Sequence, residues 1–473
     1  MQPRCWLTRA VHGAVLVAGV SRVASGAWAP AATARLGTYQ TVGQVSGRTA
    51  ADTVARTKSL DSTLAVATFD SAWRIVGASL AGRGVTRFDW PAVRRELLPR
   101  AARVQSDGEL RAVIDDMLRR LGESHFAILP PPPGATSKSA AARGDESSLG
   151  TAGVVVRVVD GRVAVWRVDS LGAARRTGVL PGWTVERIDD FTPASLGPAD
   201  SIGAKRLGAL TGAIAALRGP AGSRVRLVAR DPSGVRHDVT FERDTVRGPL
   251  ARFGNLPPLP ASVDFARRVL SDGRCAGVIR FEYWMPPVMP ALDAAVEASR
   301  GCAGIVLDLR GNLGGVAAMM MGAAGHFLAE PKTLGTMRSR GEEMRFVANP
   351  RLVSPSGVAV EPYAGPLAIL IDGLSASTTE MFAASLQSLG RARLFGERSA
   401  GQALPAIATR LPTGDILMHV IADFVAADGS RIEGRGAVPD EVVPLTAGDV
   451  QSGRDAPLDA ALKWVERARP GPR

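Results

Sequence analysis

The sequence predicts a multidomain α+β protein, and three observations support this prediction. The chain has 473 residues, which is enough for about three domains of ordinary size. Hydrophobic residues make up 46% and charged residues 22%, as in globular proteins with packed cores. The apolar pattern changes twice along the chain, from helical spacing to short strands and then to buried strands alternating with helices. We therefore expect a helical domain, a β domain and an α/β domain.

The N-terminus has the pattern of an export signal. Arg4 and Arg9 give a positive start, a short apolar run follows, and Ala27-Trp28-Ala29 fits a cleavage site. We expect a signal peptide over 1–29, a loose mature N-terminus over 30–52, and a location in the periplasm or outside a bacterial cell. No later stretch is long and apolar enough to span a membrane, so stable membrane insertion is not expected.

The net charge is +12, and it is dispersed along the chain. No dense block of lysine and arginine with interleaved aromatic residues is present, as a nucleic-acid-binding surface would require. We therefore expect no nucleic-acid partner.

Two cysteines, Cys275 and Cys302, each precede Ala-Gly and then an apolar strand. If these strands pair in parallel, both sulfurs lie at the same end of the sheet. A disulfide in an oxidising compartment and two buried free thiols are both open interpretations.

Residues 53–130 carry the helical pattern. Trp90-Pro91 is typical of a helix start, and Ser106 followed by Glu109 forms a capping box before apolar residues at helical spacing. Gly122 ends that helix. A proline-rich and then polar run predicts a linker over 131–148.

Residues 149–247 change to short β-type runs with two short helices. The expected strands are 154–159, 163–168, 184–188, 225–229 and 235–241, and the expected helices are 170–176 and 204–217. A second proline-rich linker covers 248–262.

Residues 263–473 alternate buried strands with helices, which indicates a parallel-rich α/β domain. The expected strands are 275–283, 304–309, 367–371, 393–396 and 416–424, and the expected helices are 291–299, 315–328, 378–389 and 457–467.

One turn of this domain suits a catalytic nucleophile. The strand that ends at Ile371 leads through Asp372-Gly373 to Ser377, which begins a helix. A serine at a helix N-terminus lies beside backbone N–H groups that favour developing negative charge. Ser377 and Glu380 also fit an ordinary capping box, so a purely structural role is the alternative.

Four motifs resemble the tail-specific, or C-terminal processing, peptidase family. They are 178–185 (GVLPGWTV), 304–315 (GIVLDLRGNLGG), 375–380 (SASTTE) and 396–401 (GERSAG). This resemblance implies a crotonase- or ClpP-like α/β catalytic domain, a PDZ-like domain over 149–247, and an N-terminal helical domain. It also implies peptide or protein substrates, including C-terminal tails, and no cofactor or metal.

The sequence departs from the Ser-Lys dyad that much of this family uses, because Gln402 occupies the lysine position. It is similar instead to the tricorn-like branch. Ser124-His125 matches that branch's Ser-His pair, and Glu433 matches its late glutamate.

The resemblance implies a role for each of these groups, and the chemistry is consistent with it. Ser377 needs a base, which His125 can supply near neutral pH, while Glu433 on the other imidazole nitrogen would fix the tautomer. Ser124 would join this network, and the N–H groups of Gly315 and Thr378 would form the oxyanion hole.

The PDZ-like region would hold substrate through a loop that includes Leu149, Gly150 and Thr151. Alternatively, this region only gates or spaces the site. The glycines at 311, 314 and 315 lack the P-loop and dinucleotide spacings, so they do not indicate nucleotide binding.

The leading hypothesis is an exported serine endopeptidase that acts through an acyl-enzyme on Ser377. The alternative is a non-catalytic protein of the same fold that binds a peptide or an apolar ligand. A serine enzyme with a different base is a third option. The oligomeric state stays open.

Overall fold

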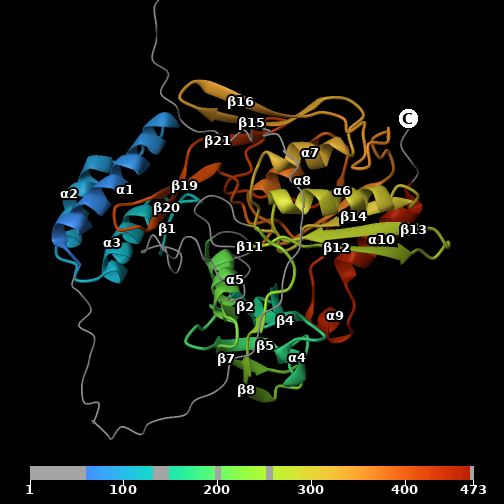
Figure 1. Ribbon diagram of the computed structural model, residues 1–473, viewed down its shortest axis with the longest axis horizontal. Coiled ribbons are helices and arrows are strands. Elements are labelled where there is room, and N and C mark those ends of the chain that lie inside the picture. The colour runs from blue at the N-terminus through green and yellow to red at the C-terminus, as the bar shows by residue number, and fades with distance from the viewer. Residues whose placement is uncertain (1–59, 131–148, 198–203, 252–258, 469–473) are drawn as a thin grey trace, which may run out of the picture. The chain divides into compact units, whose positions relative to one another are not determined.

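A computed structural model describes residues 60–130, 149–197, 204–251 and 259–468 (Figure 1). The expected signal peptide (1–29), loose N-terminus (30–52) and linker (131–148) lie outside the described residues. Within the expected linker 248–262, β10 (Leu250–Ala251) pairs antiparallel with β11 (Leu259–Pro260).

The helical region contains α1 (Ser62–Gly82), α2 (Trp90–Ala101), α3 (Asp107–Arg119) and the short strand β1 (Ala127–Leu129). Ser106 caps α3 as expected, since its side chain accepts a hydrogen bond from Glu109 N. Buried Phe69, Leu97 and Ile114 share one core with Leu411 and Leu417 from the far end of the chain. This shared core and the pairing of β1 with β20 attach the helical region to the α/β region.

The β-rich module comprises residues 149–251. Its elements are β2 (Leu149–Thr151), β3 (Val154–Val159), β4 (Arg162–Val168), α4 (Ala173–Arg176), β5 (Thr184–Ile188), α5 (Ala204–Leu217), β6 (Arg218–Pro220), β7 (Arg224–Arg230), β8 (Arg236–Glu242) and β9 (Asp244–Thr245), with β10 at its end. Five strands form an antiparallel sheet in the order β3-β4-β5-β7-β8, so β3 is an edge strand. The expected strands agree with these to within about one residue.

The α/β region is built on a six-stranded sheet in the order β12-β13-β14-β17-β18-β22. The strands are β12 (Val263–Val269), β13 (Cys275–Phe281), β14 (Gly304–Asp308), β17 (Leu367–Ile371), β18 (Arg393–Gly396) and β22 (Glu441–Val442). Strand β12 is antiparallel to β13, and all the other neighbours are parallel. The parallel character was expected, whereas β12 and β22 were not.

Helices cover both faces of this sheet (Figure 1). On one face, Ile305, Leu307 and Ile369 pack in a core with residues of α6 (Met289–Ala298), α7 (Met319–Gly325) and α8 (Thr378–Ser388). On the other face, alternate residues such as Val306 and Ala368 pack against α10 (Ala456–Arg467). Because both faces are buried, these strands are continuous apolar runs in the sequence.

Two smaller sheets complete the region. One has the order β16-β15-β21 and the other β1-β20-β19. The expected single β segment 416–424 is in fact two strands, β20 (Ile416–Val420) and β21 (Asp423–Ala426), which belong to different sheets. The remaining elements are β15 (Lys332–Ser339), β16 (Glu342–Ala348), β19 (Ala406–Arg410), the 3-10 turn η3 (Pro286–Val288) and α9 (Ala447–Gln451).

Cys275 and Cys302 form a disulfide. Strands β13 and β14 run parallel with Ala276 opposite Gly304, so the two cysteines lie at the same end of the sheet, as the sequence suggested. The alternative of two free thiols is therefore not what the structure shows.

Within the described ranges, none of the helices is both long enough and apolar enough to cross a bilayer.

Candidate active site

The turn that carries Ser377 is held by buried hydrogen bonds. Asp372, which follows β17, accepts hydrogen bonds through Oδ1 from Gly311 N (2.9 Å), Leu374 N (3.0 Å) and Ser375 N (3.2 Å). Ser377 then adopts φ +58° and ψ −122°, a strained conformation for a residue other than glycine. The surrounding hydrogen bonds hold this strain and place Ser377 at the N-terminus of α8.

Glu380 is fully buried and holds the neighbouring backbone. Its carboxylate accepts hydrogen bonds from Ser377 N (3.0 Å), Gly401 N (2.7 Å), Gln402 N (2.8 Å) and Ser399 Oγ (2.5 Å). Burial raises the pKa of Glu380 to about 7, although the four donors act in the opposite direction. The capping box predicted for Ser377 and Glu380 is therefore present. It holds the backbone of Ser377 in place, which is compatible with a catalytic role for its hydroxyl.

The backbone of Gly315 is oriented by a bridge to Trp284. Trp284 N donates to Gly314 O (2.9 Å) and Val316 N donates to Trp284 O (2.8 Å). These two hydrogen bonds form a parallel bridge between Trp284 and Gly315 that uses the residues on either side of Gly315. The N–H of Gly315 itself therefore points away from Trp284. The carbonyl of Gly315 points the same way and accepts from Thr378 Oγ1 (2.9 Å). The structure thus brings Gly315 and Thr378 together at the start of α8.

Close approach explains why glycine occupies position 314. Gly314 has φ +93°, and a Cβ atom there would lie 2.6 Å from Ser377 Cβ and 3.1 Å from Thr378 N. Only a residue without a side chain allows the two turns to meet at this distance.

Ser124, His125 and Glu433 form a second cluster. Ser124 Oγ lies 2.8 Å from His125 Nδ1 and 2.9 Å from Glu433 Oε2. Ser124 N also donates to Glu433 Oε1 (3.0 Å). When the hydroxyl gives its single proton to the carboxylate, its oxygen accepts from Nδ1–H. The Nε2 atom of His125 is then the unprotonated nitrogen, which is the form that a general base requires.

This arrangement corrects the expected role of Glu433. The sequence suggested direct contact with the imidazole, but both carboxylate oxygens are used by other donors. Oε1 accepts from Ser124 N, and Oε2 accepts from Ser124 Oγ and from Ala403 N (2.8 Å). Glu433 therefore acts on His125 through the hydroxyl of Ser124.

Burial shifts the protonation of both titratable groups. It lowers the pKa of His125 to about 4. It raises the pKa of Glu433, while the hydrogen bonds from Ala403 and Ser124 partly oppose that change. His125 is thus neutral at pH 7 and can accept a proton.

The segment 401–403 connects the two clusters. Ser377 N donates to Gln402 O (2.8 Å), Ala403 N donates to Glu433 Oε2 (2.8 Å), and Gly434 N donates to Gly401 O (2.9 Å). All of these residues are described, and among them no hydrogen bond joins His125 directly to Ser377.

The predicted substrate loop is placed differently from expectation. Leu149, Gly150 and Thr151 form β2, which pairs with β6 and β9. Thr151 alone of the three lines a cavity of about 420 Å³ bounded by β3, the end of α5, and the turn that contains Gly311 and Leu313. In the loop that follows, Ala152 N and Gly153 N already donate to Leu217 O and Thr151 Oγ1.

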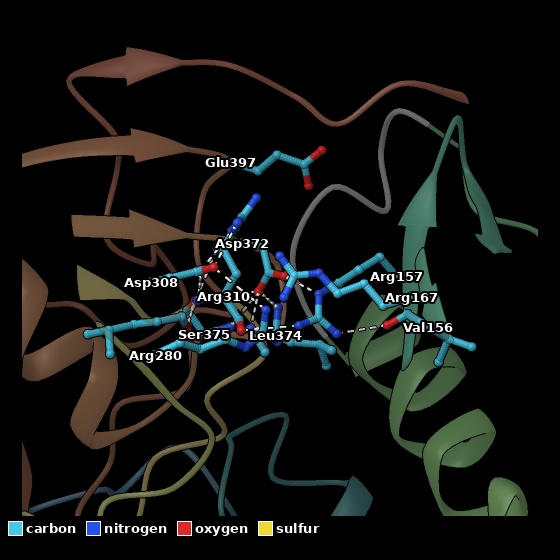
Figure 2. Close-up of polar contacts among 12 residues, drawn as sticks. Val156, Arg157, Arg167, Arg280, Asp308, Arg310, Asp372, Leu374, Ser375 and Glu397 are labelled. Atoms are coloured by element: carbon cyan, nitrogen blue, oxygen red, sulfur yellow. Dashed lines mark hydrogen bonds and ion pairs between the residues drawn. The ribbon is translucent and has the colours of Figure 1, made fainter. Parts of the chain in front are cut away.

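Figure 2 shows a link between the β-rich module and the nucleophile turn that the sequence did not reveal. Arg157 of β3 places Nε 2.8 Å from Asp372 Oδ2, and its Nη2 donates to Arg310 O (3.1 Å). Arg310 in turn pairs with Asp308 (2.7 Å), and both guanidinium groups lie over Trp166. Asp372 therefore holds the turn with one oxygen and Arg157 with the other.

Comparisons with known proteins agree with this fold. Residues 276–443 match Peptidase family S41. The chain is 24% identical over 396 residues to a carboxyl-terminal-processing protease of Synechocystis, covering 82% of this chain and 84% of that protein. A carboxyl-terminal-processing protease of Picosynechococcus is 25% identical over 381 residues, covering 79% and 82%.

Solved structures share the architecture. A photosystem II D1 C-terminal processing protease aligns with a TM-score of 0.54 at 20% identity, covering 85% of this chain and 97% of that one. Mature CPAF aligns with a TM-score of 0.55 at 14% identity, covering 86% and 97%.

Fold and relatives together define a serine peptidase. Residues 276–443 match the S41 peptidases, and about four fifths of the chain is similar to carboxyl-terminal-processing proteases, as the motifs indicated. The comparisons support an enzyme over the alternative of a non-catalytic binding protein.

Proposed function

We propose that the protein is an exported endopeptidase that cleaves peptides or unfolded protein tails through an acyl-enzyme on Ser377. One observation carries this proposal. The hydrogen-bonded set of Glu433, Ser124 and His125 is joined through 401–403 to the turn that presents Ser377 beside two amide donors.

The reaction follows from these positions. On substrate binding, His125 Nε2 takes the proton of Ser377 Oγ, which attacks the scissile carbonyl. The N–H groups of Gly315 and Thr378 stabilise the oxyanion, and Glu433 balances the imidazolium charge through Ser124. His125 then protonates the leaving amine, and a water molecule activated by His125 hydrolyses the acyl ester.

The β-rich module is the proposed PDZ-like substrate receptor. Strand β3 is an edge strand and lines the cavity, so an extended peptide can add to it as a further strand. The cavity also reaches Gly311 and Leu313, next to the glycines that approach Ser377. The names of the processing-protease relatives favour C-terminal tails as the substrates.

Export is proposed from the signal pattern in residues 1–29, and the Cys275–Cys302 disulfide is consistent with an oxidising compartment.

The test uses the chain from residue 30 onward, an unfolded protein substrate and a fluorophosphonate probe. We expect the probe to label wild type but not Ser377→Ala. His125→Ala and Ser377→Ala should each lower kcat by about 10⁴-fold or more. His237→Ala is the matched control, because His237 pairs with Asp231 on the β-rich module and should keep wild-type turnover. Labelling of Ser377→Ala, or full turnover by His125→Ala, would contradict the mechanism.

A further inference from the structure

Arg83 occupies a buried position at the end of α1. Its side chain is 1% exposed, and it forms two ion pairs, Nη1 with Glu123 Oε2 (2.7 Å) and Nη2 with Asp423 Oδ1 (3.0 Å). It is the C-cap residue of α1, where the helix dipole favours a cation. The guanidinium thus has carboxylate partners on two separate segments of the chain.

The first partner belongs to the turn that presents the proposed base. Glu123 directly precedes Ser124 and His125, and its side chain is 5% exposed. The turn enters a left-handed conformation at Gly122 (φ +62°) and again at His125 (φ +59°). A non-glycine residue in this region is strained, so contacts must hold it.

The second partner belongs to the loop that supplies the carboxylate. Asp423 begins β21, and the chain turns back through the bridge between Val425 and Arg431 before it reaches Glu433. Arg83 therefore joins the turn of His125 to the loop of Glu433. The hydrogen bonds from Ser124 to Glu433 make the same connection from the other side.

We propose that Arg83 is a positioning residue for the Glu433–Ser124–His125 relay, which it holds by clamping residues 122–125 against the loop from Asp423 to Glu433. The proposal rests on the proposed function. It is separate from the general attachment of the helical region, which other contacts provide, such as Ser79 Oγ to Val420 O (2.6 Å).

Arg83 also balances charge at this junction. The charged groups gathered there are Glu123 and His125 on the turn, Asp423, Arg431 and Glu433 on the loop, and Arg83 and Arg87 from the helical region. Without Arg83, the ion-pair partner that Glu123 would keep within the described part of the chain is Arg87, whose side chain is 57% exposed. Burial and the charge of Glu123 already raise the pKa of Glu433, so loss of Arg83 would raise it further.

The experiment compares Arg83→Met with Arg111→Met in the chain from residue 30. Arg111 is the matched control, because it also joins the helical region to the α/β region, through Asp415 (2.8 Å), without touching the turn. For Arg83→Met we expect kcat to fall by at least about tenfold with KM within about twofold, and the acid limb of kcat/KM to move to higher pH. For Arg111→Met we expect a lower Tm, an unchanged acid limb and kcat within about twofold of wild type.

Arg83→Lys keeps a charge but loses the two-armed geometry, so it should recover part of the activity and provide a second folded variant. The proposal fails if Arg83→Met and Arg111→Met lose activity in proportion to their loss of Tm, with no movement of the acid limb. Failure of the proposed function looks different, because His125→Ala would then keep wild-type turnover.

Discussion

The hydroxyl of Ser124 determines which ring nitrogen of His125 carries the proton. It lies 2.8 Å from Nδ1 and 2.9 Å from Glu433 Oε2, so a carboxylate that never touches the imidazole can still set its tautomer. Burial keeps His125 neutral over a wide pH range, which suits a base that must accept a proton. Under the proposed mechanism, the charge that appears on His125 during reaction is balanced through one intervening hydroxyl.

The pH dependence of kcat/KM should reflect these protonation states. A base with a pKa lowered to about 4 stays deprotonated as the pH falls, so we expect activity to persist well below 6.5. Because burial raises the pKa of Glu433, the rising limb in wild type should include protonation of that carboxylate. Glu433→Gln should lower kcat and remove the part of the acid limb that comes from protonation of this carboxylate. The remaining acid limb would then report the protonation of His125. A single limb near 6.5 that Glu433→Gln does not change would contradict this account.

At the scale of elements, two turns at the ends of parallel strands create the proposed site. The turn after β14 brings Gly314 and Gly315 to the N-terminus of α8, and the turn after β17 presents Ser377. Asp372 holds both turns, since it accepts from Gly311 N and from Leu374 N. Parallel strands end at the same edge of a sheet, which explains how residues distant in sequence come together here.

Gly314→Ala tests this close approach. The new Cβ would meet Ser377 Cβ at 2.6 Å and Ala376 O at 2.8 Å, and a residue with φ +93° is strained in any case. We expect at least a hundredfold loss of kcat and a loss of about 1–3 kcal/mol in the free energy of unfolding from backbone strain alone.

Gly390→Ala is the control for Gly314→Ala. It has φ +67° with no atom within 4 Å of the new Cβ, so it should lose some stability but keep its turnover. Urea unfolding and steady-state kinetics measure both variants. Equal loss of activity in the two would argue against a specific contact at Gly314.

At the scale of the whole molecule, each part of the chain contributes to the surroundings of Ser377. The helical region supplies His125 and the α/β region supplies Ser377 and Glu433. The β-rich module supplies Arg157, which pairs with Asp372 of the nucleophile turn (Figure 2). Burial lowers the pKa of Arg157 to about 10, so it is still a cation at neutral pH and pairs with Asp372.

Arg157→Met should therefore affect both stability and the site. Removing one partner of a buried ion pair costs about 3–5 kcal/mol, because Asp372 keeps an uncompensated charge. We expect a lower midpoint of urea unfolding and slower labelling of Ser377 by a fluorophosphonate. Arg226→Met breaks an exposed pair with Asp238 on the same module, so it should leave the midpoint of urea unfolding close to that of wild type and should not slow labelling. Equal labelling rates in both variants would show that Arg157 has no influence on the nucleophile.

Much of this organisation could be predicted from the sequence, because it depends on local patterns. Buried parallel strands are apolar runs, and Ser106 caps α3, so both were predicted nearly to the residue. The expected capping box did not form, because the Glu109 carboxylate accepts from Gln105 N (2.7 Å) and not from Ser106 N. Strands β12 and β16 were missed because most of their residues are exposed and charged residues interrupt them, so neither is a continuous apolar run.

Part of the site could not be predicted for a different reason. The motifs identified Ser124, His125 and Glu433, but not that the hydroxyl lies between the other two, since this order depends on tertiary contacts. The pairs of Arg83 with Asp423 and of Arg157 with Asp372 join residues hundreds of positions apart. No local pattern reports such contacts.

Glu433 follows both His125 and Ser377 along the chain, and this order has a consequence during synthesis. Under the proposed mechanism, a polypeptide that has been translated only as far as Ser377 already contains His125 but cannot orient this base until the segment with Glu433 has been translated and folded. On that mechanism, hydrolysis would begin only after Glu433 has joined Ser124 and His125 in the folded chain.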